Sequence, residues 1–299
     1  SKSVESSFSE AYMFGKNVSL GLNIYRRDLN SFNYIGNNRD TTYSQATTGF
    51  QVRAGVPLTE YLTAVASYTL NYDDVSLAKD QFFSTRLGPD LECDPLLAGR
   101  YLCDAIGKRL SSIVGMSLIY DTLDNRVRPT RGLTASINGD FAGLGGDVRY
   151  ARLRLNASQF KNLGKGFIFS LSGEGGAIKS LNNDDIRLTD RFYLGEPQIG
   201  GFDIRGVGPR VIRKPYVDDS GNILADAPNK NDLDVGLSGR RRDWTDDALG
   251  GKYYYLAKAE IEIPLGSGAR ELGLRPSIFV NAGSVWGSDF DQNRLDGAS

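Results

Sequence analysis

The residues that most favour a defined chemistry lie in one glycine-rich stretch, Gly200-Gly201-Phe202-Asp203-Ile204-Arg205-Gly206-Val207-Gly208-Pro209. The stretch lies inside a long polar segment that separates two strand-like sequences. A lone arginine between small and apolar residues is suited to docking on an internal surface, because its planar guanidinium can bind a carboxylate with two parallel hydrogen bonds. An isolated Arg-Gly pair would otherwise be a solvated turn. In this context we expect a loop folded into the lumen of a β-barrel, with Arg205 as its anchor.

Most other site chemistry is disfavoured by composition. The chain has no histidine, which removes the commonest general base and metal ligand, and its two cysteines cannot build a zinc cluster. Carboxylate chemistry is not excluded on this ground. The 35 basic and 36 acidic residues leave a net charge of -1, which gives no electrostatic reason to expect a nucleic-acid partner. We therefore predict no catalytic, cofactor or metal site.

The two cysteines, Cys93 and Cys103, lie ten residues apart in a polar connection. In an oxidising compartment the simplest prediction is a disulfide between them. Closing so short a loop contributes roughly 2–3 kcal/mol in the chain-entropy model. The expected role is to stiffen the connection, with no redox function.

The elements that would position these residues are β-strands, because polar and apolar residues alternate along much of the chain. The polar side of several strands carries full charges, such as Arg152 with Arg154 and Lys258 with Glu260. A soluble sandwich also alternates, but its alternate residues face a packed core. Charged residues opposite apolar ones instead suit a hydrated lumen and a lipid-facing surface. No window approaches 18 consecutive apolar residues, so we expect no transmembrane helix.

Alternation and turn signals predict ten strands, and short and long connections follow one another between them. The predicted strands are roughly 4–12, 18–30, 43–55, 61–72, 109–121, 132–142, 148–160, 166–178, 252–264 and 275–287. The long polar connections are about 31–42, 74–108 and 179–250, with a shorter one near 143–147. Alternating short and long connections are typical of the periplasmic turns and extracellular loops of outer-membrane barrels.

The fold class is therefore all-β, a transmembrane antiparallel β-barrel. A closed ten-stranded barrel is conceivable, but the side chains of so small a barrel fill its interior, and a loop of about 70 residues needs more room. We expect residues 1–299 to form an internal portion of a larger barrel domain, with the loop at about 179–250 entering the lumen. The sheet should then be open at the strands near 4–12 and 275–287.

Several motifs occur in an order that resembles the barrel of BamA-type outer-membrane assembly factors. The Arg205 stretch resembles the family's Val-Arg-Gly-Phe/Tyr motif on the sixth extracellular loop, and reads Ile204-Arg205-Gly206-Val207 here, with valine in place of the aromatic residue. The other matching pieces are Phe8 to Asn17, Asp121 to Asn125 with Pro129 to Gly132, Phe192 to Gly195, Ala248 to Gly251, and Glu260 to Leu265. The resemblance covers nearly the whole chain.

The resemblance implies a barrel of sixteen strands, of which this chain would supply strands 4 to 13. It also implies that Arg205 docks on acidic residues of the inner barrel wall. Glu260 matches one of those residues and points inward by parity. Asn281 stands where the family often has aspartate, so that Glu262 is a possible substitute partner.

The function implied by the resemblance is folding and insertion of client β-barrel proteins into the bacterial outer membrane. The implied partners are client outer-membrane proteins, accessory assembly lipoproteins, and outer-membrane lipid with lipopolysaccharide. The alternatives are a two-partner secretion or TamA-like translocation porin of the same superfamily, or a passive diffusion porin. An outer-membrane enzyme is disfavoured because no Ser/His or Asp/His pair can form without histidine.

Overall fold

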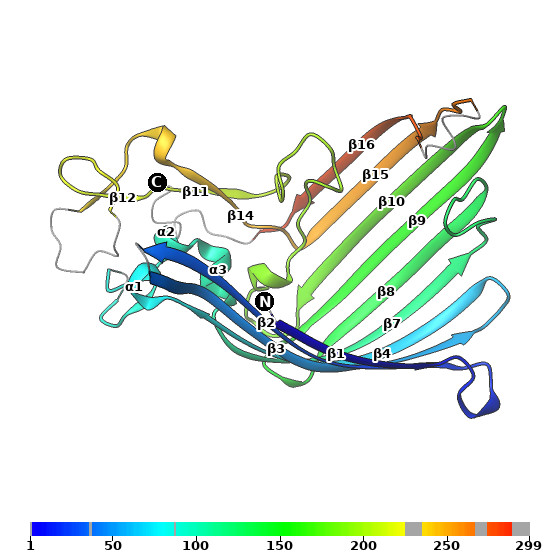
Figure 1. Cartoon of the computed structure of the whole chain (residues 1–299), viewed down its shortest axis with the longest axis horizontal. Helices are drawn as coiled ribbons and strands as arrows, with labels where there is room; N and C mark the ends of the chain where they lie inside the picture. The colour runs from blue at the N-terminus through cyan, green and yellow to red at the C-terminus, as the bar shows by residue number, and fades with distance from the viewer. Residues whose placement is uncertain (1, 36–37, 87, 225–234, 267–273, 289–299) are drawn as a thin grey trace.

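Ten long strands form a single antiparallel sheet in a computed structural model that describes residues 2–35, 38–86, 88–224, 235–266 and 274–288 (Figure 1). The strands are β1 (Lys2–Glu10), β2 (Ser19–Ile35), β3 (Asn38–Pro57), β4 (Leu62–Leu77), β7 (Gly107–Asp121), β8 (Gly132–Gly146), β9 (Tyr150–Gly164), β10 (Phe167–Ser180), β15 (Tyr253–Glu262) and β16 (Ser277–Trp286). Their order in the sheet is their order in the chain. All ten predicted strands are thus confirmed.

The two faces of the sheet differ as the alternation predicts. Outward-pointing apolar side chains such as Met116, Leu153 and Leu155 are exposed along the strands. The opposite face carries charged residues that pair across strands: Arg152 lies opposite Asp140 in the β8–β9 register and donates two hydrogen bonds to it, at 2.9 and 2.8 Å. An apolar outer face and a polar inner face are the arrangement of a membrane β-sheet.

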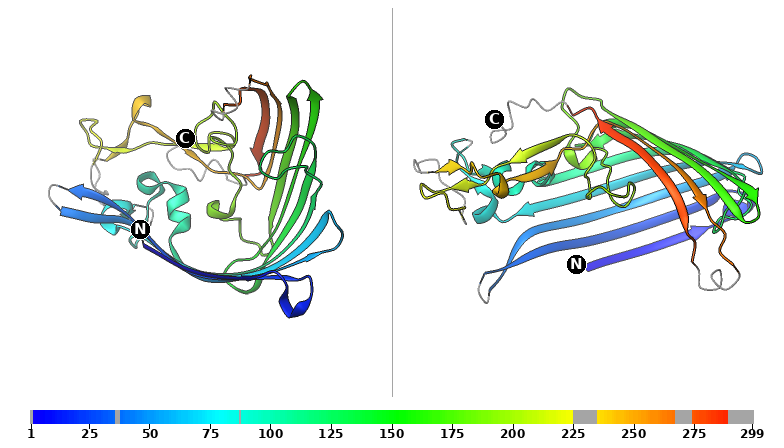
Figure 2. Two further views of the ribbon diagram at one scale, coloured as in Figure 1. Left: turned by 45° about the vertical axis from the view of Figure 1, so that its right-hand side comes forward. Right: turned by 90° about the horizontal axis from the view of Figure 1, so that it is seen from above.

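The sheet is curved but not closed. β1 pairs only with β2 and β16 only with β15 among the described residues, so both end strands are free edges. Figure 2 shows the sheet bending around one side, with the helices and the long connection after β10 on its concave face. The expectation of an open sheet is confirmed.

Two predicted boundaries are wrong. The connection expected near 143–147 lies almost wholly within β8, which pairs with β7 as far as Gly146 across a register shift. Residues 31–42 were expected to form a long connection, but β2 continues to Ile35 and β3 begins at Asn38, with ladder pairs such as Asn33 with Asp40. Polar sequence does not end an antiparallel hairpin, because backbone pairing continues where both faces of the hairpin are wet. The polar sequence here marks a strand extension.

Two long connections lie at one end of the sheet, and we call their folded parts, within residues 78–106 and 181–252, the cap. The first contains α1 (Lys79–Phe82), β5 (Phe83–Ser84), β6 (Glu92–Cys93), α2 (Pro95–Ala98) and α3 (Arg100–Ala105). The second contains the 3-10 turn η2 (Leu188–Asp190), β11 (Arg210–Arg213), β12 (Tyr216–Val217), β13 (Gly236–Leu237), the 3-10 turn η3 (Arg241–Asp243) and β14 (Thr245–Ala248). A short 3-10 turn, η1 (Met13–Gly15), lies between β1 and β2 at the other end. No described helix is long and apolar enough to span a membrane.

The buried core lies between the cap and the concave face of the sheet. One cluster joins Tyr150 and Ile178 of the sheet to Ile186, and another joins Leu194 and Ile199 to Val285 of β16. The second connection is therefore packed on the sheet by apolar contacts.

The connection between β7 and β8 is organised by the carboxylate of Asp124. It accepts hydrogen bonds from the backbone N–H groups of Asn125, Thr130 and Arg131, at 3.0, 2.9 and 3.1 Å, and from the Thr130 hydroxyl. The Thr130 hydroxyl bond and these backbone bonds lower the pKa of Asp124 to about 2, although the residue is exposed. Hydrogen bonds to the charged form favour that form.

This turn should weaken only in strong acid. Because the folded pKa of Asp124 lies below the ordinary value, its stabilising contribution is present above about pH 4 and is lost as the pH falls through about 2. A carboxyl-carbon NMR titration of Asp124 checks this. A midpoint for Asp124 near 4 would show that the hydrogen bonds of the turn are not formed.

Candidate functional site

The Ile204–Val207 motif forms a tight turn whose backbone is bonded to the start of the same connection. Val207 N–H donates to the Leu194 carbonyl at 3.1 Å, and Gly206 N–H donates to the Asp203 carbonyl at 2.8 Å. Phe192 and Gly251 exchange two backbone hydrogen bonds at 2.9 and 3.0 Å, which tie the connection to the strand leading into β15. The motif is thus bonded through its backbone to the Phe192–Leu194 segment, which is itself bonded to the residues leading into β15.

Two glycines make this turn possible. A Cβ on Gly195 would lie 2.3 Å from the Asp203 carbonyl oxygen and 2.6 Å from the Arg205 nitrogen, and a Cβ on Gly206 would lie 2.7 Å from the same carbonyl oxygen. Neither contact can be relieved by moving a flexible side chain, because the atoms approached are backbone. Arg205 itself has a φ of 58°, in the left-handed region that non-glycine residues rarely occupy.

The Arg205 guanidinium lies against the faces of two tyrosine rings of the cap, in the corner that the rings form. Its Cζ lies 4.3 Å from the ring centroid of Tyr101 on α3 and 4.7 Å from that of Tyr193. The two rings are 6.0 Å apart in an edge-to-face arrangement, and the Tyr193 hydroxyl donates to the Leu188 carbonyl at 2.8 Å. Burial raises the pKa of the Tyr193 phenol. Tyr193 therefore stays neutral, and both rings act on the cation through their faces.

The predicted carboxylate partners of Arg205 are occupied elsewhere, so that pairing needs correction. Glu260 pairs with Lys258, two residues away on the same face of β15, at 2.7 Å. The loop does reach the level of Glu260, because a Cβ on Gly200 would lie 3.9 Å from the ring of Phe279, which pairs with Glu260 in the register. The left-handed turn at Arg205, however, directs its side chain towards the cap.

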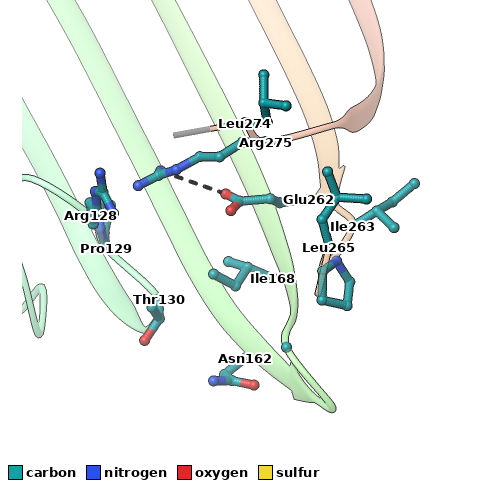
Figure 3. Close-up of a pocket in the computed structure, with 12 residues that line it drawn as sticks. Arg128, Pro129, Thr130, Asn162, Ile168, Glu262, Ile263, Leu265, Leu274 and Arg275 are labelled. Carbon is teal, nitrogen blue, oxygen red and sulfur yellow. Dashed lines mark ion pairs between the residues drawn. The ribbon is translucent and has the colours of Figure 1, made fainter. Parts of the chain in front are cut away.

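Two other predicted partners also lie away from Arg205. Asn281 faces Lys258 in the β15–β16 register. Glu262 lies 3.9 Å from Arg275 at the far end of the strands, where both line a pocket of about 330 Å³ with Arg128 and Ile168 (Figure 3). At about 3.3 Å per residue, a strand carries Glu262 far from the cap.

The remaining motif residues have different environments. Val207 is half-buried and packs against the cluster of Leu194, Ile199 and Val285. Ile204 is 76% exposed and contributes no packing. The position where the resembled family has an aromatic residue thus has a packing role here with a smaller side chain.

The predicted disulfide is confirmed. Cys93 and Cys103 are bonded with Cα atoms 5.7 Å apart, and the bond joins β6 to α3. α3 is also the helix that carries Tyr101, so the cysteines and the arginine motif meet in one part of the cap. The sequence gives no sign of this proximity, because more than 100 residues separate Cys103 and Arg205.

A buried carboxylate that sequence reasoning missed joins the two connections of the cap. Asp94 is fully buried and accepts hydrogen bonds from Ser84 Oγ at 2.7 Å, Tyr216 Oη at 2.7 Å and Leu96 N–H at 2.9 Å. The Asp94-Pro95 sequence is a helix-start signal that could have indicated the bond to Leu96. Tyr216, from the other connection, could be found only in the folded structure.

Ion pairs complete the attachment of the cap. Arg109 at the start of β7 pairs with Asp190 of η2 at 2.8 Å. Arg213 of β11 pairs with Asp247 at 2.8 Å and donates to the Leu97 carbonyl at 2.9 Å. These bonds join the sheet, the first connection and the second connection. In the parts of the chain that the structure describes, no group of three or more acidic or cysteine side chains could hold a metal ion.

A curved antiparallel sheet with an apolar outer face, whose longest connection is packed on the inner face, defines the class of outer-membrane β-barrel proteins with an internal loop. Residues 1–298 match the Omp85 superfamily domain, and the chain belongs to that superfamily.

The particular relatives are assembly factors. The chain is 28% identical over 235 residues, 77% of its length, to the outer membrane protein assembly factor BamA of Neorickettsia risticii. It is 32% identical over 106 residues, 35% of its length, to the sorting and assembly machinery component 50 homolog of Bos taurus. It spans 26% and 23% of these two relatives, respectively.

The fold has a solved counterpart. The crystal structure of BamA from Haemophilus ducreyi lacking POTRA domains 1-3 superposes with a TM-score of 0.67 and 20% identity, covering 98% of this chain and 51% of that one. At this identity the likeness concerns the fold. The superfamily, the BamA relatives and the fold place the chain in the bacterial outer membrane.

Proposed function

We propose that this chain forms part of the barrel of an outer-membrane assembly factor, which folds and inserts client β-barrel proteins. The observation that carries the proposal is the internal loop: in an Omp85 chain, the connection between β10 and β15 is packed on the concave face and its Arg205 motif is held there by the cap. The names of the BamA and sorting-and-assembly relatives support it.

The protein acts in this proposal without covalent chemistry, cofactor or metal. The ten described strands belong to a barrel of sixteen, and the connection at about 179–250 enters its lumen. In such a barrel the first and last strands of the sixteen, which are not among these ten, can part, and their unpaired backbone N–H and C=O groups can template a client strand by β-augmentation. Its partners are client outer-membrane proteins, accessory assembly lipoproteins, and outer-membrane lipid with lipopolysaccharide.

A translocation porin of the same superfamily is the second candidate, because the same internal loop could gate a passage for an unfolded substrate. A passive diffusion porin is less well supported, because apolar contacts pack the connection against the sheet.

Reconstitution of the full-length protein into phospholipid vesicles distinguishes these functions. An assembly factor should raise the yield of folded, protease-resistant client barrel well above that of protein-free vesicles, while single-channel conductance stays low. Uptake of an unfolded soluble passenger, with no gain in folded client, would instead support translocation. A large steady conductance without either activity would support a diffusion porin.

A further inference from the structure

The short helix α3 connects the disulfide to the arginine motif. Within its six residues, Tyr101 contacts Arg205, Cys103 is bonded to Cys93, and Asp104 accepts a hydrogen bond from Leu188 N–H at 3.4 Å. A helix of six residues is not stable by itself, because helix nucleation is unfavourable and few bonds follow it. The position of Tyr101 therefore depends on what holds α3 in place.

The two tyrosines that contact Arg205 are held in place in different ways. Tyr193 belongs to the same connection as Arg205, and its hydroxyl is bonded to the Leu188 carbonyl. Tyr101 comes from the other connection and packs against the cluster of Leu188, Val211 and Leu249. The disulfide holds the helix that carries Tyr101, and it makes no covalent link to the connection that carries Tyr193. Loss of the disulfide should therefore release Tyr101 while Tyr193 stays in place.

We propose that Tyr101 and Tyr193 form an aromatic clamp on Arg205, and that the Cys93–Cys103 bond positions this clamp. The connection 78–106 thereby controls how firmly the Arg205 motif is held on the concave face. Tyr101 is a positioning residue that acts through Arg205. This inference concerns the holding of the motif and can be tested without any client, so it stands or fails separately from the assembly function.

The test is the rate at which phenylglyoxal, a small arginine reagent, modifies Arg205 in the full-length protein in lipid vesicles, read by mass spectrometry. Tyr101→Leu removes one of the two aromatic contacts of Arg205. We expect it to raise the rate of phenylglyoxal modification at Arg205 by about tenfold. Tyr101→Phe keeps the ring and should retain the parental rate, since the Tyr101 hydroxyl makes no hydrogen bond within the described residues.

The disulfide variant carries the second half of the test. Cys93→Ser with Cys103→Ser should raise the Arg205 rate as Tyr101→Leu does, and combining all three changes should add little, because the same aromatic contact is lost. Arg154, half-exposed on the concave face, is the internal control and should react at a constant rate.

Specific outcomes would overturn the clamp. An unchanged Arg205 rate in the cysteine variant would show that the disulfide does not position it. Equal rates for Tyr101→Phe and Tyr101→Leu would show that the ring does not cover the guanidinium. If Arg154 reacts faster as well, Tyr193→Leu provides the second measurement, and a parental Arg205 rate in that variant contradicts the proposal.

Discussion

Asp94→Ala is expected to separate the two connections of the cap while leaving the ten-stranded sheet paired. The change removes the acceptor of the Ser84 and Tyr216 hydroxyls and of the Leu96 N–H, in a position with no exposure. A buried polar group left without a partner costs about 1–3 kcal/mol, so losing the common acceptor of three donors is a large local effect. Backbone bonds of the strands do not involve this carboxylate.

Hydrogen exchange followed by mass spectrometry measures this effect. Peptides covering 83–98 and 213–217 should exchange faster in Asp94→Ala, and peptides of β8 and β9 should not change. Asp94→Asn is the matched control, because it keeps the volume and one acceptor oxygen and should have a smaller effect. Unchanged exchange in both cap segments would mean that Asp94 does not join the connections.

Arg205→Ala should weaken barrel assembly without loss of the folded sheet. It removes the cation that lies 4.3 and 4.7 Å from the centroids of Tyr101 and Tyr193, so that the turn at Ile204–Val207 loses its side-chain contact with α3 and keeps only its backbone bonds. Contact with each ring is worth about 0.5–2 kcal/mol, depending on how dry the site is. Arg205→Lys keeps a charge but loses the planar stacking surface, and should rescue only in part.

Complementation of a depletion strain tests this prediction, with growth and the level of folded client barrels as readouts. Arg240→Ala is the control, because Arg240 is an exposed cap arginine away from the clamp. Full growth with normal client levels in Arg205→Ala would show that holding the motif is dispensable.

Much of the fold followed from local pattern. Period-2 alternation identified all ten strands, because each has one wet and one apolar face, and the opposed charges of Arg152 and Asp140 on the inner face follow from the same parity. Connection length correctly placed the two long segments at one end of the sheet. The pattern failed at 31–42 and near 143–147, where polar or glycine-rich sequence was taken as the end of a strand although pairing continued.

The site was only partly predictable. The cysteine pair and the glycine-rich motif were evident from the sequence, because a disulfide and a tight turn depend on residue types close together in the chain. The resemblance favoured a carboxylate partner for Arg205, yet Glu260 is taken by Lys258 on its own strand. Alternation along a strand shows which face of the sheet a side chain is on. It does not show which of several oppositely charged neighbours pairs with that side chain.

The sequence by itself determined an open, two-faced membrane sheet, a disulfide and an internal arginine loop. Only the tertiary structure decided that Tyr101 and Tyr193 hold Arg205, and that Asp94 joins Ser84 to Tyr216. The physical reason is distance along the chain. Strand periodicity is a local property, whereas the contacts of Tyr101 with Arg205 and of Asp94 with Tyr216 join residues more than 100 positions apart, and they exist only once the connections fold over the sheet.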